Sequence, residues 1–339
     1  MRQLGVLMTA TQKRLLLALT AVTAPATATP TASRERFQGL GFLPGFNESR
    51  ANGVNTDGTV VVGDAVTPGA QAFRWVNGTM TGLGFLTASG VNADGTVVVG
   101  VGTGPSGGLA EAVRWVNGTV TGLGFLPGDI GSNANGVNAD GTVVVGTSFS
   151  ENSEQAFRWV NGTMTGLGFL PSAERSQARG VSANGRVVVG SSFNLAGPGQ
   201  GNQAFRWVNG TMTGLGFLPG DTNSSALGVN ANGRVVVGQS LPAKSQAFRW
   251  VNGTMTGLGF LPGGTASVAF GVSANGKVVV GVGVSADIAG TRQAFRWTAA
   301  TGMQSVKALL QAAGVNIPGW QLFEATAVSA DGTKIVGSG

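Results

Sequence analysis

A repeat of about 43 residues runs through the chain and limits its possible folds more than any other feature. Three motifs recur in a fixed order: GLGFL, then GVNADGTVVVG and its variants, then AFRWVNG. The first motif begins at Gly39, and the last turn glycine of the second is Gly332. One such unit cannot bury its own apolar residues, so we expect neighbouring units to pack on one another.

Each repeat predicts four short antiparallel strands. GVN, a turn and TVVVG form one hairpin, and AFRWV, a turn and TMTGLGFL form a second. Asp-Gly and Asn-Gly are strong hairpin signals because both central positions tolerate a positive φ. The pattern therefore predicts an all-β fold, a β-propeller of about seven four-stranded antiparallel blades. A parallel β-helix is the main alternative, but its coils are shorter and are not joined by two-residue turns.

The two ends of the repeat region depart from this pattern. The motifs supply one strand fewer than seven complete blades need, and we read this as a truncation at Gly339 or a three-stranded last blade. We expect a strand at Gly39–Leu43 to close the ring against the last hairpin. The segment SVKALLQAAG (Ser305–Gly314) predicts a short helix near 305–313, with an irregular loop as the alternative. The single propeller domain is expected to span residues 37–339.

The first 32 residues have the pattern of a secretory signal peptide. Lys13 and Arg14 precede the apolar run Leu15–Ala24, and small residues follow, which places cleavage near Ala26–Ala28 or shortly after. The apolar run is too short to span a bilayer, so no membrane span is expected in the mature chain. The prediction is a secreted, extracellular or periplasmic bacterial protein.

Composition excludes several kinds of chemistry. The sequence has no Cys and no His, which removes disulfides, thiolate nucleophiles and imidazole bases. The Ser-His and Cys-His catalytic arrangements are therefore impossible. The formal net charge is +6, of which Arg2, Lys13 and Arg14 contribute three charges within the predicted signal peptide. We expect no cofactor and no bound metal.

The acidic residues divide into turn residues and scattered loop residues. Asp57, Asp94, Asp140 and Asp331 occupy the same turn position that Asn fills in other repeats, which is typical of a structural turn rather than a catalytic carboxylate. This turn supplies too few oxygen ligands for calcium. No spacing selects two of the remaining acids as a glycosidase-like pair. We therefore predict that the protein is not an enzyme, with a hydrolase or lyase acting on polysaccharide as a less favoured reading.

One arginine stands beside the tryptophan of each of six repeats. The interpretation we favour is that these arginines pack between blades and bond to carbonyl groups. The alternative is a ring of six cations that binds a polyanion such as an acidic glycan. The residues are Arg74, Arg114, Arg158, Arg206, Arg249 and Arg296.

The variable connections give the main functional expectation. In a meander all tight turns lie on one face of the ring, so the connections that differ in length and content lie on the other face. Variable polar loops on a rigid scaffold are where recognition usually occurs. We predict a binding or interaction module whose partner is an extracellular glycan or protein and not a nucleic acid. The alternative is a structural surface or matrix protein without a discrete ligand.

The motif set also resembles a known family. QAFRW, an Asn-Gly turn, GLGFLPG, a polar loop and GVNADGTVVVG together resemble the HAF-type bacterial extracellular repeat family. Its His-Ala-Phe strand here has Gln in place of His, at Gln71, Gln155, Gln203, Gln246 and Gln293. The resemblance covers Phe37 to the end of the chain. It implies export and a propeller-like fold, and no activity.

Overall fold

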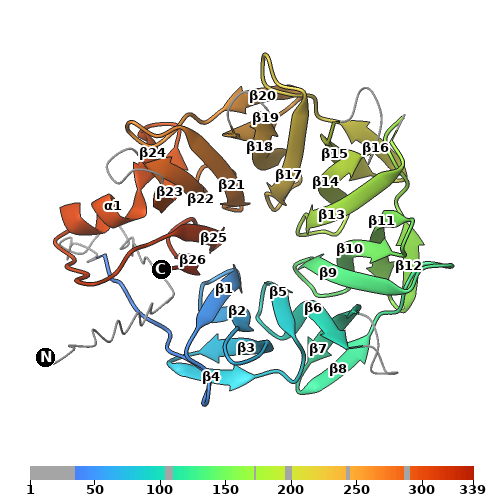
Figure 1. Cartoon of the computed structure of the whole chain (residues 1–339), viewed down its shortest axis with the longest axis horizontal. Coiled ribbons are helices and arrows are strands. Elements are labelled where there is room, and N and C mark those ends of the chain that lie inside the picture. The colour runs from blue at the N-terminus through green and yellow to red at the C-terminus, as the bar shows by residue number, and fades with distance from the viewer. Residues whose placement is uncertain (1–34, 104–109, 172, 195–200, 242–244, 286–290) are drawn as a thin grey trace, which may run out of the picture.

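A computed structural model of the chain describes residues 35–339 except 104–109, 172, 195–200, 242–244 and 286–290. Its sheets stand around a central opening like the blades of a propeller (Figure 1). The all-β propeller prediction is confirmed, but the blade count differs from the expected seven. Six sheets have four strands each, and β25–β26 forms a two-stranded sheet. The predicted signal peptide, residues 1–32, lies outside the described residues.

The GVN and VVVG motifs form the inner half of every blade. The innermost strands are β1 (Ser49–Val54), β5 (Thr87–Val91), β9 (Gly131–Val137), β13 (Arg175–Val181), β17 (Asn223–Val229), β21 (Ala266–Val272) and β25 (Glu324–Val328). The second strands are β2 (Val60–Ala65), β6 (Val97–Thr103), β10 (Val143–Phe149), β14 (Val187–Phe193), β18 (Val235–Leu241), β22 (Val279–Ser285) and β26 (Ile335–Ser338).

The AFRWV and TMTG segments form the outer half of six blades. The third strands are β3 (Gln71–Val76), β7 (Ala110–Val116), β11 (Glu154–Val160), β15 (Gln203–Val208), β19 (Gln246–Val251) and β23 (Thr291–Thr298). The outermost strands are β4 (Thr79–Gly82), β8 (Thr119–Gly122), β12 (Thr163–Gly166), β16 (Thr211–Gly214), β20 (Thr254–Gly257) and β24 (Gly302–Ser305). We number these four-stranded sheets blades 1 to 6 in chain order.

Two kinds of tight turn lie on one side of the ring, which we call the turn face. In the outer hairpins of blades 1 to 5 both turn residues have positive φ, as at Asn77 (49°) and Gly78 (90°), which fits the type I′ turn expected of Asn-Gly. In the inner hairpins only the glycine is left-handed, as at Gly58 (71°), so the prediction of two positive-φ residues is wrong there. The strand ends that lead into the variable connections lie on the opposite side, the loop face; parts of these connections lie outside the described residues.

Every innermost strand has a β-bulge, and the bulge explains an invariant glycine on the strand beside it. The register between β13 and β14 shifts between Ala178 and Gly180, so Arg179 is the extra residue. A Cβ on Gly190 of β14 would lie 1.9 Å from the carbonyl oxygen of Gln177. Only glycine therefore fits where the bulged strand approaches.

Each four-stranded blade is packed on both faces, which explains the run of three consecutive valines in its second strand. Between blades 3 and 4 the core combines Val143 and Val145 of one blade with Val188 and Phe205 of the next. Leu167 and Leu170 of the connecting LGFL segment complete this core. The same arrangement recurs between the other four-stranded blades.

The two-stranded sheet occupies the place between blade 6 and blade 1. The Ala330 N–H donates to the Thr56 carbonyl at 3.0 Å, and the Thr326 hydroxyl donates to the Ala51 carbonyl at 2.8 Å. The Lys334 ammonium donates to the Asp57 carbonyl at 2.7 Å. The ring is therefore closed through its inner strands.

A helix fills the space that a third strand occupies in the other blades. The predicted helix is confirmed as α1 (Val306–Ala312), which begins after Ser305. Val306 and Leu310 pack with Ala294 of blade 6 and with Ile335 of the two-stranded sheet. The helix thus supplies apolar side chains that a third strand would otherwise supply.

The strand expected at Gly39–Leu43 is not present. The segment has no strand pairing, and Gly41 has a left-handed φ of 82°, which is incompatible with an extended strand. Leu40 and Leu43 are nevertheless buried, against Val61 of blade 1 and Val336 of β26. Each later LGFL segment is likewise a connection, because the outermost strands end at the glycine before it.

Candidate functional site

The repeats differ from one another most at three strand positions near the loop face. Two of them, represented by Arg50 and Asp64, are cross-strand partners in every blade. The third is the bulge residue, which lies two positions after the first on the innermost strand. The first position holds seven different residue types: Arg50, Thr87, Asn133, Gln177, Ser225, Val268 and Glu324. The bulge position holds Asn52, Ser89, Asn135, Arg179, Leu227, Phe270 and Thr326. The position on the second strand holds Asp64, Val101, Thr147, Ser191, Gln239, Val282 and Ser338.

Two positions next to these three do not vary. Alanine precedes the bulge in all seven repeats, and its cross-strand partner is always glycine, as in the pair Ala51 and Gly63. Framework and variable positions therefore alternate along the same strands. The variable residues include members that line the central channel, namely Phe270 and Thr326.

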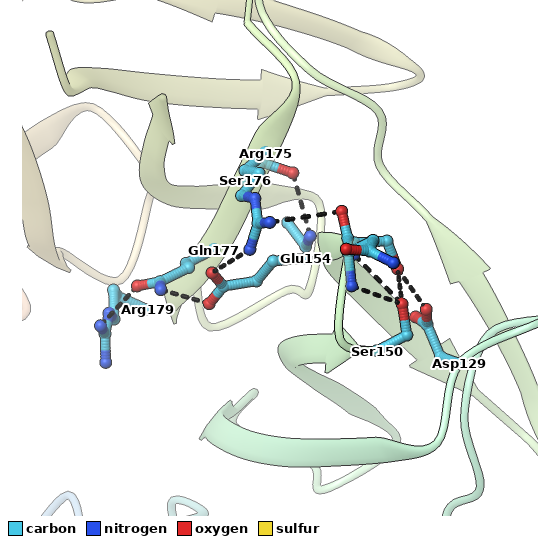
Figure 2. Close-up of polar contacts among 10 residues, drawn as sticks. Asp129, Ser150, Glu154, Arg175, Ser176, Gln177 and Arg179 are labelled. Atoms are coloured by element: carbon cyan, nitrogen blue, oxygen red, sulfur yellow. Dashed lines mark hydrogen bonds and ion pairs between the residues drawn. The ribbon is translucent and has the colours of Figure 1, made fainter. Parts of the chain in front are cut away.

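A polar network joins blades 3 and 4 at this level (Figure 2). The Arg179 guanidinium donates to the Gln177 side-chain carbonyl at 2.6 Å, and the Gln177 amide donates to the Glu154 carboxylate. Arg175 lies 4.0 Å from the same carboxylate. Glu154 comes from the third strand of blade 3, whereas its three partners belong to β13 of blade 4. The network therefore fixes the side chains of two blades relative to each other.

Arg179 lies at the end of this network. Figure 2 shows its guanidinium pointing away from the sheet, and its side chain is exposed. Loss of hydration lowers the pKa of Arg179, and the Glu154 carboxylate partly offsets this effect. Arg179 remains protonated because the pKa of arginine is so high.

The bulge positions are chemically uneven around the ring. Blades 1, 3 and 4 carry Asn52, Asn135 and Arg179 at the bulge position, whereas blades 5 and 6 carry Leu227 and Phe270. The Asn52 amide donates to the Ala88 carbonyl at 2.9 Å, and that of Asn135 donates to the Ala178 carbonyl at 2.8 Å, so both asparagines link neighbouring blades. Phe270 instead lines the channel with an apolar ring.

A groove on the loop face lies on blade 4, between the connections that enter and leave that blade. It has a volume of about 330 Å³ and is lined by Phe217, Gln203, Asp221 and Thr222 among others. Phe217 is 38% exposed, although it is a large apolar residue. An exposed aromatic ring beside amide, hydroxyl and carboxylate groups is suited to a ligand with an apolar face and several hydroxyls.

Two carboxylates approach each other on blade 1. Arg50 donates to Glu48 at 2.9 Å, and Asn52 donates to Asp64. Desolvation raises the pKa of Asp64, and the Glu48 charge adds to this effect. No sequence spacing predicted this pair, because the β1–β2 hairpin brings together residues 16 positions apart. Within the described ranges, no group of three or more acidic residues could hold a metal ion.

The six predicted arginines lie at the opposite side of the ring, on the turn face. Five donate through Nε to the turn-glycine carbonyl of the next blade, at 3.0–3.2 Å. The guanidinium of Arg74 also lies over the Trp115 ring of the next blade, 5.9 Å from its centroid. Each of these five arginines therefore links two blades. All six remain partly exposed. A role in binding a polyanion remains a prediction.

The turn acids perform the structural task expected of them. The carboxylates of Asp57, Asp94 and Asp140 accept the backbone N–H two residues later at 2.9–3.0 Å. Hydrogen bonds from the threonine at that position lower the pKa of all three carboxyl groups.

No family model and no curated protein matches this sequence. Solved structures are similar at the level of the fold. A protein assigned as TolB from Agrobacterium tumefaciens shares 12% identity and a TM-score of 0.51, over 96% of this chain and 97% of that one. The β-propeller domain of the Trilobed protease from Pyrococcus furiosus shares 11% identity and a TM-score of 0.53, over 80% and 83%.

A third structure, TolB from Acinetobacter baumannii, has 12% identity and a TM-score of 0.49. The match covers 84% of this chain and only 64% of that TolB chain. The two structures with TM-scores above 0.5 support the propeller fold and nothing finer. The resemblance to the HAF-type family remains a prediction. In the part of the chain that is described, no helix has the length and apolar character needed to cross a membrane.

Proposed function

We propose that this protein is an exported, non-enzymatic binding module that holds a glycan on its loop face, across the mouth of the central channel. The observation that carries the proposal is the concentrated difference between repeats. Seven residue types occupy the position of Arg50, whereas the neighbouring position is alanine in every repeat. A purely structural ring would need no such contrast between adjacent positions of one strand.

The chemistry of the loop face favours a glycan over a purely apolar partner. The groove at Phe217 combines an exposed aromatic ring with amide and hydroxyl groups, and a sugar ring has an apolar face and hydroxyls to match them. The innermost strands add the exposed Arg179 cation in blade 4 and the Phe270 ring, which lines the channel, in blade 6. Different blades thus offer different contacts to one ligand. Extracellular or periplasmic location is part of the same proposal.

The test is an array of neutral glycans probed with the full chain at near-physiological salt. The variant Q177S/R179L gives blade 4 the residues that blade 5 carries at the same positions, so the repeat itself indicates that they fit the fold. We expect saturable binding to weaken by about tenfold or more, as when one or two central contacts are lost. The variant F217A should weaken it further.

The matched control makes the same kind of exchange on the turn face. N184D/R186T gives blade 4 the turn residues of blade 3 and should leave neutral-glycan binding unchanged. Equal loss in both variants would contradict a loop-face site. If no glycan binds and the chain self-associates during sedimentation, the structural alternative replaces this proposal.

A further inference from the structure

The turn face carries two different charge patterns on two halves of the ring. The inner turns of blades 1, 2 and 3 read Asp-Gly-Thr, whereas those of blades 4, 5 and 6 read Asn-Gly followed by Arg or Lys. The basic residues are exposed. They are Arg186, Arg234 and Lys277.

Both turn sequences fold in the same way. The side-chain oxygens of Asn184, Asn232 and Asn275 accept the backbone N–H two residues later at 2.9–3.1 Å, as the aspartates do in the other blades. The backbone therefore needs an oxygen acceptor and not a negative charge. Turn geometry does not account for the change from acidic to basic, so another property of the surface must.

The inter-blade arginines bring a second cation to each basic turn. Arg158 bonds to Gly185 beside Arg186, and Arg206 bonds to Gly233 beside Arg234. In the same way, Arg249 bonds to Gly276 beside Lys277. In the acidic half the equivalent arginine meets a turn that carries an aspartate, as Arg74 does at Gly95 next to Asp94. Two cations thus meet at each of three consecutive blade junctions. We call these six side chains the basic arc: Arg158, Arg186, Arg206, Arg234, Arg249 and Lys277.

Few acids accompany the basic arc. The inner and outer turns of blades 4, 5 and 6 contain no Asp or Glu. Among the described residues, none of the six cations forms an ion pair with a carboxylate. Burial lowers the pKa of Arg158, Arg206 and Arg249, yet arginine remains charged at neutral pH. A groove of about 540 Å³ at one end of the arc is lined by Arg249, Lys277 and Arg296, together with Asp331 of the last inner turn, whose carboxylate accepts hydrogen bonds from Ser329 and Thr333.

We propose that the basic arc on blades 3 to 6 binds a linear anionic polysaccharide, whose sulfate or carboxylate groups contact the cations at successive blade junctions. Repeated cations along a curved row match repeated anions along a chain. Guanidinium groups bind both sulfate and carboxylate oxygens through paired hydrogen bonds. The site lies on the face opposite the loop-face site, so either proposal can fail without the other.

A nucleic acid fits the same surface less well. Single-stranded nucleic acids bind to exposed aromatic rings on which the bases stack. The tryptophans of blades 3 to 5 pack against the inter-blade cores, and the exposed phenylalanines lie in the loop-face connections. Trp297 of blade 6 lines the groove at one end of the arc, but the arc offers no row of rings for successive bases, which favours a polysaccharide.

The test measures binding of the full chain to heparin and to polygalacturonate, which separate sulfate from carboxylate recognition. The variant R186T/R234T/K277T restores the threonine of blades 1 to 3 and should weaken binding about tenfold to a hundredfold. Added salt should weaken binding of the unmodified protein. A thermal melt checks that the variant folds.

The decisive control moves the cations instead of removing them. R186T/R234T/K277T combined with T59R/T96R/T142R keeps the net charge and places the added cations beside Asp57, Asp94 and Asp140. We expect this relocated variant to bind as weakly as the triple variant. Binding equal to that of the unmodified protein would show that net charge alone matters and would overturn the arc. Failure to bind either polysaccharide, or tighter binding of single-stranded DNA, would also overturn it.

Discussion

The two faces of the ring differ in what the repeats keep constant. On the loop face, alanine and glycine hold the backbone while the side chains between them change from blade to blade. On the turn face the side chains are nearly uniform within each half of the ring, and only the charge changes between the halves. One face offers several different contacts, and the other offers one contact repeated. These arrangements suit a single shaped ligand and a long repetitive one, respectively.

The largest effect is expected at the framework that both faces share. In G190A the new Cβ would lie 1.9 Å from the Gln177 backbone oxygen, so the bulged strand must move. We expect a loss of more than about 3 kcal/mol of unfolding free energy in denaturant titration, with both binding activities lost together. G69A is the control, because a Cβ there meets nothing within 4 Å. If G190A abolished one activity and preserved stability, the two faces would not depend on one framework.

A smaller effect separates the two roles of the turn-face cations. R206K keeps the charge but removes the Nε donor to the Gly233 carbonyl, which lies 3.0 Å away, and should cost about 1 kcal/mol of stability while weakening heparin affinity less than the loss of a whole charge does. R234T removes an exposed charge and should do the reverse, with affinity weakened about threefold to tenfold and stability changed by less than about 0.5 kcal/mol. Thermal melts and heparin titrations measure both. If the two variants changed stability and heparin affinity alike, the inter-blade hydrogen bond and the charge would not have separate roles.

The smallest effect is a pH dependence of opposite sign on the two faces. Desolvation raises the pKa of Asp64, so its ionised form destabilises the fold at neutral pH, and this cost is removed as pH falls through the raised value. D64N should therefore be at least as stable as the unmodified protein at pH 7, with a flatter melting profile between pH 7 and 4.

On the turn face, hydrogen bonds from Thr96 lower the pKa of Asp94 below its usual 3.8. Its contribution to stability is therefore present above 3.8 and is lost as pH falls through the lowered value. D94N should differ from the unmodified protein only above this range. Melting temperatures at closely spaced pH values compare the two variants, and shifts of the same sign would contradict the contrast.

The hairpins could be predicted from sequence because their signals are local. Asn-Gly between β-prone runs predicted the outer hairpins. The run Ser305–Gly314 predicted the helix, because capping and helix propensity act within a few residues. The extent of the last strand of each repeat was overestimated. Left-handed glycines such as Gly41 end the extended backbone, and the leucines beside them are apolar because they pack between blades.

The candidate sites required knowledge of packing between repeats. The sequence did not indicate which strand is innermost, so the seven bulge residues could not be assigned to the channel. The pairing of Glu154 with Gln177 joins two blades, and the repeat period of the sequence does not predict it. The arginine positions were evident from sequence, but their division into two halves depends on which turn each one reaches across the blade interface.

The interchange of Asp and Asn at the inner turns has a consequence for how such proteins can be altered. Either side chain accepts a hydrogen bond from the same backbone N–H. The charge of a blade's inner turn is therefore set by two residues that do not pack in the core. The charge of such a ring can therefore be changed one blade at a time by substituting these turn residues. New polyelectrolyte specificities could then be composed without redesigning the scaffold.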